Sequence, residues 1–289
     1  MSEQVSHHPP ATAYCIRNKT SGVQLEGYNA QKATFKSTII VKQIGHAVLT
    51  LPHGNETETY LITLPSLHIE GLIFGAPFVE LDGSSYITSS TGYTCKIDYS
   101  GKGWLSGTKN SVTATVYPTG KEKEVLYNVT GTWNKKFEAY EGPAKKNSKS
   151  TLIETYDAEN TAQTELKVAP IEDQHPLESR RAWSKVAEAI SKGDMDATSV
   201  EKSKIEQAQR DMRIKEREED RVWERRYFTA VENDDVLKTL GSAAGVPVDG
   251  ESDKTGGLWR FDPAKAAKAD AESLSKDEKE KLEKELLGW

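Results

Sequence analysis

The sequence predicts an α+β fold, with strands in the first half of the chain and helices in the second. Three observations support this prediction. Short β-rich runs alternate with turn signals as far as residue 140. Beyond that point, charged stretches with a helical period replace them. The net charge also changes, from +1 over residues 1–140 to −7 over residues 141–289.

The first half should form an antiparallel meander, because short strands at this spacing are typical of a sheet that closes into a barrel or a sandwich. Turn signals such as His53-Gly54-Asn55 and Asp82-Gly83 separate the runs. Apolar and polar residues alternate over residues 111–118, so one face of the sheet should be dry and the other wetter. The expected strands cover residues 12–18, 23–29, 33–44, 47–52, 58–65, 67–74, 93–100, 111–118 and 124–134.

The second half should contain a short helix, a long charged helix and a helical tail. The first helix is expected over residues 176–191 and ends at Gly193. Thr198 lies three residues before Glu201, which is the spacing of a capping box, and predicts the start of a long helix over residues 199–221. A loop over residues 240–258 and a solvated tail helix over residues 262–288 complete the expectation.

The composition excludes several classes of protein. No run reaches the roughly 18 apolar residues that a membrane-spanning helix requires. No basic start with an apolar core opens the chain, so we expect no secretory leader. Two cysteines, Cys15 and Cys95, are too few for a disulfide framework or a Cys-rich zinc site. Phosphate-loop, zinc-protease and serine-hydrolase motifs are absent from the sequence, so we expect no enzyme, no cofactor and no metal.

The first candidate site is the run His7-His8-Pro9-Pro10. The prolines fix the backbone torsions and remove two N–H donors, which places both imidazoles at the edge of the first expected strand. Adjacent imidazoles can donate hydrogen bonds to an anion, and a bound phosphate favours their charged form. A double histidine is often incidental, so this pattern by itself leaves both interpretations open.

The second candidate site is on the long helix. Lys202, Glu206 and Arg210 are spaced four residues apart and therefore share one face. One interpretation is a surface ladder of ion pairs, each stabilising the helix by a few tenths of a kcal/mol. In the other, Lys202 and Arg210 hold phosphate oxygens, while Glu206 orients the two cations or accepts from a ligand hydroxyl.

The run Glu3-Gln4-Val5-Ser6-His7-His8-Pro9-Pro10 resembles the signature of the oxysterol-binding protein-related family. Further blocks resemble the short fungal members of that family, the Kes/Osh type, over nearly the whole chain to Phe261. The family's N-terminal lid and first strands, which precede this signature, are expected to be missing. The blocks include Val41-Lys42-Gln43-Ile44-Gly45-His46, Leu67-His68-Ile69-Glu70-Gly71, Pro77-Phe78-Val79-Glu80-Leu81, Trp223-Glu224-Arg225-Arg226 and Trp259-Arg260-Phe261.

The resemblance implies a fold and its division along the chain. Residues 1–140 should form part of an incomplete antiparallel β-barrel around a lipid tunnel. Residues 141–261 should form the helical C-terminal part of the same lipid-binding domain, and residues 262–289 a charged tail.

The resemblance also implies an activity and its residues. Such a protein binds phosphatidylinositol 4-phosphate and exchanges it for a sterol between membranes, without any covalent step. The head-group site would combine His7 and His8 with Lys202, Glu206 and Arg210. Polar residues of the lipid tunnel would be Asn29 and Gln43.

The expected partners are phosphatidylinositol 4-phosphate and a sterol or another lipid, with phosphatidylserine as an alternative to the sterol. We expect a cytoplasmic monomer that contacts endoplasmic reticulum, Golgi or plasma membranes transiently and peripherally, and that binds no nucleic acid. Two other hypotheses stay open. One is a truncated, transfer-incompetent lipid-binding fragment with an interaction or regulatory role. The other is a metal-dependent hydrolase built on His7, His8 and His68.

Overall fold

The computed structural model describes residues 1–289 except 36–37, 73–74, 102–106, 145–149, 244 and 246–256. The chain divides into two compact units. Unit 1 combines Met1–Ala162 with Arg225–Ala266, and unit 2 combines Gln163–Glu224 with Ala267–Trp289. Each unit is described by itself.

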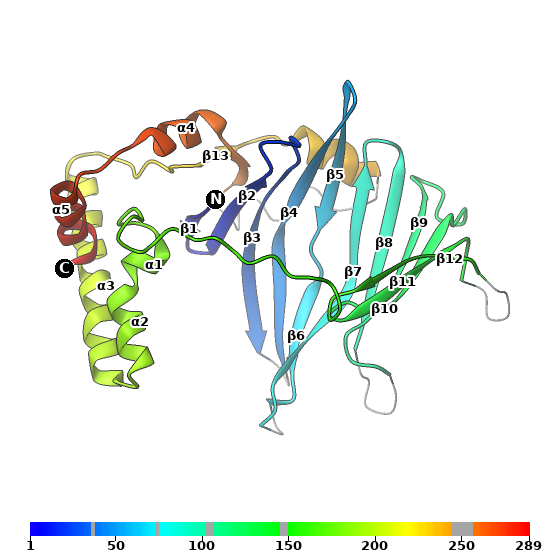
Figure 1. The fold of residues 1–289 in the computed structure, drawn as a ribbon, viewed down its shortest axis with the longest axis horizontal. Helices are drawn as coiled ribbons and strands as arrows, with labels where there is room; N and C mark the ends of the chain where they lie inside the picture. Colours follow the sequence, from blue (N-terminus) through cyan, green and yellow to red (C-terminus); the bar gives the residue numbers. More distant parts are fainter. Residues whose placement is uncertain (36–37, 73–74, 102–106, 145–149, 244, 246–256) are drawn as a thin grey trace. The chain divides into compact units, whose positions relative to one another are not determined.

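Unit 1 is built on one antiparallel sheet of twelve described strands (Figure 1). Neighbours in the sheet follow one another along the chain from β1 to β12, except that β6 pairs with β4 and β7. Within the described residues β1 and β12 end the sheet without pairing with each other, which agrees with the predicted incomplete barrel. The strands are β1 Ser2–His7, β2 Pro10–Arg17, β3 Gln24–Phe35, β4 Ile39–His53, β5 Glu56–Thr63, β6 Ser66–Glu70, β7 Phe78–Ser89, β8 Tyr93–Ser100, β9 Ser111–Pro118, β10 Tyr127–Thr132, β11 Lys136–Glu141 and β12 Leu152–Asp157.

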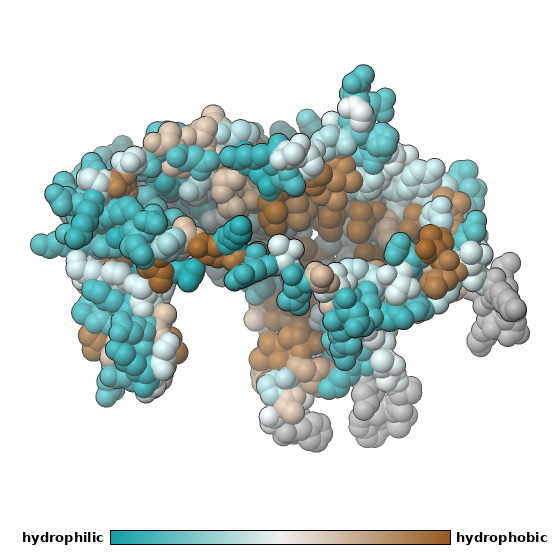
Figure 2. Space-filling view, viewed as in Figure 1, coloured by the Kyte–Doolittle hydropathy of each residue, from teal (hydrophilic) through white to brown (hydrophobic). Residues whose placement is uncertain are grey.

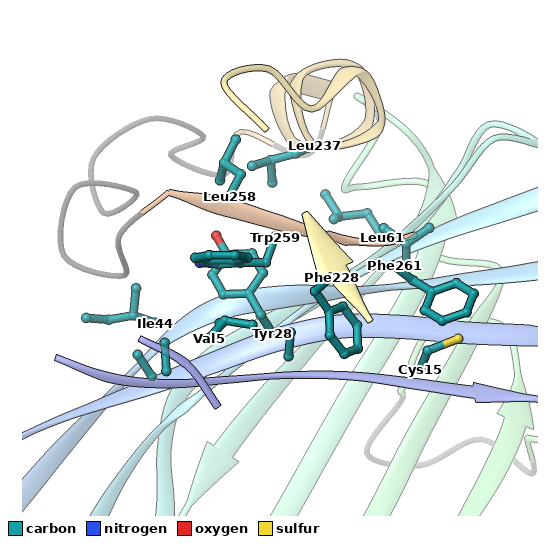
Figure 3. Close-up of a cluster of buried hydrophobic side chains, with 14 of the residues drawn as sticks. Val5, Cys15, Tyr28, Ile44, Leu61, Phe228, Leu237, Leu258, Trp259 and Phe261 are labelled. Atoms are coloured by element: carbon teal, nitrogen blue, oxygen red, sulfur yellow. The ribbon is translucent and has the colours of Figure 1, made fainter. Parts of the chain in front are cut away.

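One face of the sheet is covered at its β1–β5 end. The cover consists of a small two-stranded sheet, β13 (Phe228–Val231) and β14 (Leu258–Phe261), with the π-helix η2 (Leu237–Gly241) beside it. Figure 3 shows side chains of the cover meeting those of β1 to β5 in one apolar core. The core members include Val5, Cys15, Tyr28, Ile44, Leu61, Phe228, Leu237, Trp259 and Phe261.

The opposite face of the sheet is apolar as well, yet only partly buried. Because side chains alternate along each strand, residues in register with Ala47 and Ile62 point away from the cover. Figure 2 shows hydrophobic residues gathered over the middle strands. The register places Leu25, Leu49, Ile62, Ile87, Ile97, Val116 and Val129 on this face.

Buried charges attach the cover to the sheet. Asp234 is only 4% exposed, and its Oδ2 lies 3.0 Å from His46 Nε2. Its Oδ1 accepts from Arg260 Nη2 at 2.6 Å and from the Leu237 backbone N–H at 2.9 Å. Arg260 also donates to Glu26 of β3 at 2.8 Å. Burial raises the pKa of Asp234, but the hydrogen bonds from His46, Leu237 and Arg260 outweigh it and hold the pKa well below its ordinary value.

Unit 2 is helical. Its helices α2 and α3 pack side by side, and α3 also packs against α5. Among the described residues, no helix is long and apolar enough to cross a membrane. The core of the unit combines Ala182, Val186, Ile205, Met212, Leu286 and Leu287. The helices are α1 Ser179–Ala182, α2 Ser184–Ser191, α3 Met195–Glu218, α4 Pro263–Ala271, which straddles the boundary between the units, and α5 Lys276–Leu287.

The tail is less solvated than the sequence suggested. Residues 262–288 contain two helices, and the second buries Leu286 and Leu287 in the core of unit 2. These leucines, with Leu282 four residues before Leu286, give α5 a short apolar stripe that its many charges conceal.

Several predicted strand boundaries were wrong, and β1, β7, β11 and β12 were not among the expected strands. The strand expected over residues 33–44 is the end of β3 and the start of β4, which pair with each other as Phe35 with Ile39. Asp82-Gly83, expected as a turn, lies inside β7. There β7 passes from pairing with β6 to pairing with β8, and the positive φ of Gly83 bends the strand without ending it.

The predicted start of the long helix was also wrong. Asp194 is the N-cap, and its carboxylate accepts from the Ala197 backbone N–H at 2.8 Å. Thr198 lies inside the first turn, where its hydroxyl donates to the Asp194 carbonyl. The loop expected over residues 240–258 falls largely outside the described residues.

Replacing Asp234 by Asn should destabilise the protein at pH 7 by about 3 kcal/mol, because His46 and Arg260 lose a buried anionic partner. Since the pKa of Asp234 is lowered by folding, its contribution is present above its ordinary pKa of 3.8 and is lost as the pH falls below it. Urea unfolding should therefore show a large difference between wild type and D234N at pH 7 and a smaller one at pH 3.

The matched control is Asp98→Asn, which removes a surface ion pair with Lys96. This change should cost less than about 1 kcal/mol. An equal loss for the two variants would contradict a special role for Asp234.

Candidate functional site

His7 and His8 lie at the turn between β1 and β2. Their ring centroids are 4.2 Å apart, with the rings nearly perpendicular at 87°. Both side chains are exposed, and the peptide bond from His8 to Pro9 is cis. The structure therefore keeps the two imidazoles adjacent and open to a ligand, as an anion site requires.

The strand that carries this pair is held by residues that the sequence did not single out. The Glu3 carboxylate accepts from the backbone N–H groups of Arg226 and Tyr227, at 2.8 and 2.9 Å. Arg225 Nε donates to the Val5 carbonyl at 2.8 Å. Glu3 belongs to the signature and Arg225-Arg226 to another block of the resemblance, but nothing in their spacing indicates that they meet.

Lys202, Glu206 and Arg210 form one charged row on α3. Lys202 Nζ lies 2.9 Å from Glu206 Oε1, and Arg210 Nη2 lies 3.6 Å from Glu206 Oε2. The hydrogen bond from Lys202 is the main cause that lowers the pKa of Glu206. The row is accessible, since the Lys202 and Arg210 side chains are 54% and 66% exposed.

Both interpretations of this row fit its geometry. It is an ion-pair ladder as it stands, and it also presents two cations to solvent on either side of one carboxylate. The row belongs to unit 2 and the histidine pair to unit 1. Convergence of the two on one anion therefore stays a prediction.

The two predicted polar tunnel residues meet. Asn29 Nδ2 donates to Gln43 Oε1 at 3.3 Å, and Gln43 Nε2 donates to the Pro65 carbonyl at 2.8 Å. Both side chains lie on the partly buried apolar face of the sheet. Gly45 faces Asn29 across the strands, and a Cβ there would collide with the Tyr28 carbonyl oxygen, so only glycine fits. These amides are a polar spot on a mainly apolar face.

The described residues contain no group of three or more His, Cys, Asp or Glu side chains that could hold a metal ion. His68 lies on β6, where its ring faces Glu70 at 3.7 Å and Asp82 at 3.4 Å. Both cysteines are free thiols, and burial raises the pKa of Cys95 to about 11.

Within its described residues, the chain thus combines an antiparallel sheet whose uncovered face is mainly apolar with an exposed histidine pair at the edge of that sheet. The family model described as oxysterol-binding protein matches residues 1–262. The chain therefore belongs to the oxysterol-binding protein family.

Several curated proteins are similar to this chain. Protein kes1 of Schizosaccharomyces pombe is 45% identical over 251 residues, which cover 86% of this chain and 63% of the relative. Protein KES1 of Mycosarcoma maydis is 42% identical, covering 83% and 62%. The probable transporter efuK of Hormonema carpetanum is 38% identical, covering 93% and 38%. The chain thus spans less than two thirds of the length of these relatives.

Solved structures share the fold. The Osh1 ORD domain in complex with ergosterol superposes with a TM-score of 0.69 at 18% identity, covering 96% of this chain and 66% of that one. The Osh3 ORD of Saccharomyces cerevisiae in complex with PI(4)P superposes with a TM-score of 0.57 at 19% identity, covering 80% and 61%.

Replacing Gln43 by Met removes a donor and an acceptor while keeping a similar volume. Asn29 and the Pro65 carbonyl then each lose a partner, which should destabilise the protein by roughly 1–3 kcal/mol in urea unfolding. Gln31→Met is the control, because Gln31 pairs with Gln43 in register yet is exposed. It should change the stability by less than about 0.5 kcal/mol. Equal losses for the two variants would rule out the amide contact as the cause.

Proposed function

We propose that this chain binds phosphatidylinositol 4-phosphate and exchanges it for a sterol between membranes. The head group would be held by His7 and His8 together with Lys202, Glu206 and Arg210. The acyl chains or the sterol would lie against the apolar face of the large sheet, beside Asn29 and Gln43. The protein would act as a monomer that contacts membranes transiently and peripherally.

The single observation that carries this proposal is the exposed histidine pair at the edge of a sheet whose uncovered face is apolar. A phosphoinositide combines an anionic head group with apolar chains, so it needs both features together. Imidazole N–H groups bind phosphate oxygens, and cationic side chains strengthen that binding. Two solved structures of this fold, one in complex with ergosterol and one with PI(4)P, support the same pair of ligands.

Exchange follows from the use of one surface by two ligands. A sterol and a phosphoinositide both need the apolar face, so binding of one should displace the other. Only the phosphoinositide needs the cations, while the sterol hydroxyl would use the amides of Asn29 and Gln43. The two lipids should therefore compete with each other and respond to different substitutions.

The double substitution of His7 and His8 by Ala should abolish extraction of phosphatidylinositol 4-phosphate from liposomes. The measurement is the lipid left on the liposomes after the protein is added, read with a fluorescent probe of the head group. His53→Ala is the control, because His53 is an exposed histidine at another hairpin turn. Extraction that survives the double substitution would overturn the head-group assignment.

The same assay separates the alternatives. If ergosterol competes with phosphatidylinositol 4-phosphate, sterol is supported as the exchanged lipid. If phosphatidylserine competes and ergosterol does not, phosphatidylserine takes the place of the sterol in the proposal. Binding of either lipid without transfer between two liposome populations would favour a transfer-incompetent, lipid-binding fragment.

Lys202→Ala combined with Arg210→Ala should weaken extraction of phosphatidylinositol 4-phosphate about tenfold or more, because two charge-assisted contacts to phosphate are lost. Sterol binding should stay unchanged. Lys192→Ala is the control, since Lys192 forms a similar exposed ion pair with Glu188 on α2. If Lys192→Ala weakens extraction equally, the effect is one of overall charge and the row on α3 has no specific role.

A further inference from the structure

The strand β1 depends on contacts outside the sheet. Within the described part of the chain it pairs with β2 alone, so its other edge has no strand partner. The register with β2 shifts between Gln4 and Ser6, which is a β-bulge at Val5. The bulge turns the Val5 side chain into the core, where it is 1% exposed.

The hairpin turn that follows is poor in hydrogen-bond donors. Pro9 and Pro10 have no backbone N–H, and Pro10 is the residue in register with His7. The usual ladder bond that closes such a turn is therefore missing on the Pro10 side. Something other than the turn itself must fix the direction in which His7 and His8 point.

The segment Arg225–Tyr227, here called the anchor segment, supplies these contacts. Arg225 Nε donates a hydrogen bond to the Val5 carbonyl at the bulge. The guanidinium carbon also lies 5.9 Å from the centroid of the Trp259 ring. The backbone N–H groups of Arg226 and Tyr227 both donate to the Glu3 carboxylate. A carboxylate that accepts two backbone N–H bonds fixes both position and rotation, because its two oxygens are held separately.

We infer that Glu3 and Arg225 are positioning residues for the histidine pair: they fix β1 at its bulge and so orient His7 and His8 toward an anionic lipid head group. This inference rests on the function proposed above. Neither side chain needs to touch the lipid. The Glu3 carboxylate is occupied by the anchor segment, four residues before His7, and Arg225 acts through the Val5 carbonyl.

The inference is tested with Glu3→Ala and Glu3→Gln in the full chain. Three quantities are measured: extraction of phosphatidylinositol 4-phosphate, binding of a fluorescent sterol, and the thermal midpoint of unfolding. Glu3→Ala removes both acceptor oxygens and should weaken phosphoinositide extraction about tenfold, the scale typical of groups that orient binding residues. Sterol binding should stay within about twofold, because the apolar face does not depend on the turn. Glu3→Gln keeps one carbonyl oxygen and should lie between wild type and Glu3→Ala.

A purely structural role predicts a different pattern, in which both lipids lose affinity in parallel with a lower thermal midpoint. That result, or unchanged extraction by Glu3→Ala, would overturn the inference. Arg225→Met serves as a second variant, because it loses the donor to the Val5 carbonyl and the cation over the Trp259 ring while keeping an apolar side chain. It should reproduce the selective loss even if Glu3→Ala does not fold. Glu124→Ala, at an exposed surface ion pair, is the control and should change none of the three quantities.

The experiment distinguishes failure of the proposed function from failure of the positioning role of Glu3 and Arg225. If wild type extracts phosphatidylinositol 4-phosphate and the His7/His8 double variant does not, the function stands whatever Glu3 does. If wild type itself extracts none, the proposed function fails before the positioning residues are tested.

Discussion

Asp234 is a buried anion whose only compensation is the set of donors around it, and the arrangement of unit 1 depends on that compensation. An isolated carboxylate in this position would be strongly unfavourable. His46 from the sheet, Arg260 from β14 and the Leu237 N–H from η2 meet on it, and Arg260 reaches on to Glu26. Because every donor comes from a different element, the charge network connects β4, β14 and η2 at one point.

The two faces of the sheet therefore differ in the kind of contact they make. The covered face forms the core and uses directional, charged contacts to fix the cover. Among the described residues, the opposite face is mainly apolar, with side-chain hydrogen bonds at Asn29–Gln43, Tyr60–Glu58 and Ser85–Tyr99. A surface of this kind suits ligands that differ in shape but share apolarity, because it imposes few directional requirements on them.

Much of the sheet could be predicted from sequence, because most neighbours in it are hairpins and their apolar alternation is local. The expected strands did not include β1, β7, β11 or β12. β1 buries a single apolar side chain, Val5, and so has no clear alternation of apolar and polar residues. The prediction of a turn at Asp82-Gly83 was wrong, because a glycine with positive φ can form a bend within a strand as readily as a turn. At the site, the His7–His8 contact follows from adjacency. The contact of Glu3 with Arg226 joins residues 223 positions apart, and that of Asp234 with His46 joins residues 188 positions apart. The periodicity of the sequence cannot predict contacts at such separations.

The contact between Glu3 and Arg226 also has a consequence for the order of assembly. Sequential hairpins from β2 to β11 can form one after another as the chain is synthesised, with little loop-closure entropy. β1 is made before the other described strands, yet the partners of its Glu3 carboxylate are 223 and 224 residues later. The strand that carries the histidines is therefore fixed late, after most of the sheet already exists. Until then it has β2 as its only sheet partner among the described strands and an open edge, the state in which a chaperone or a neighbouring chain would encounter it.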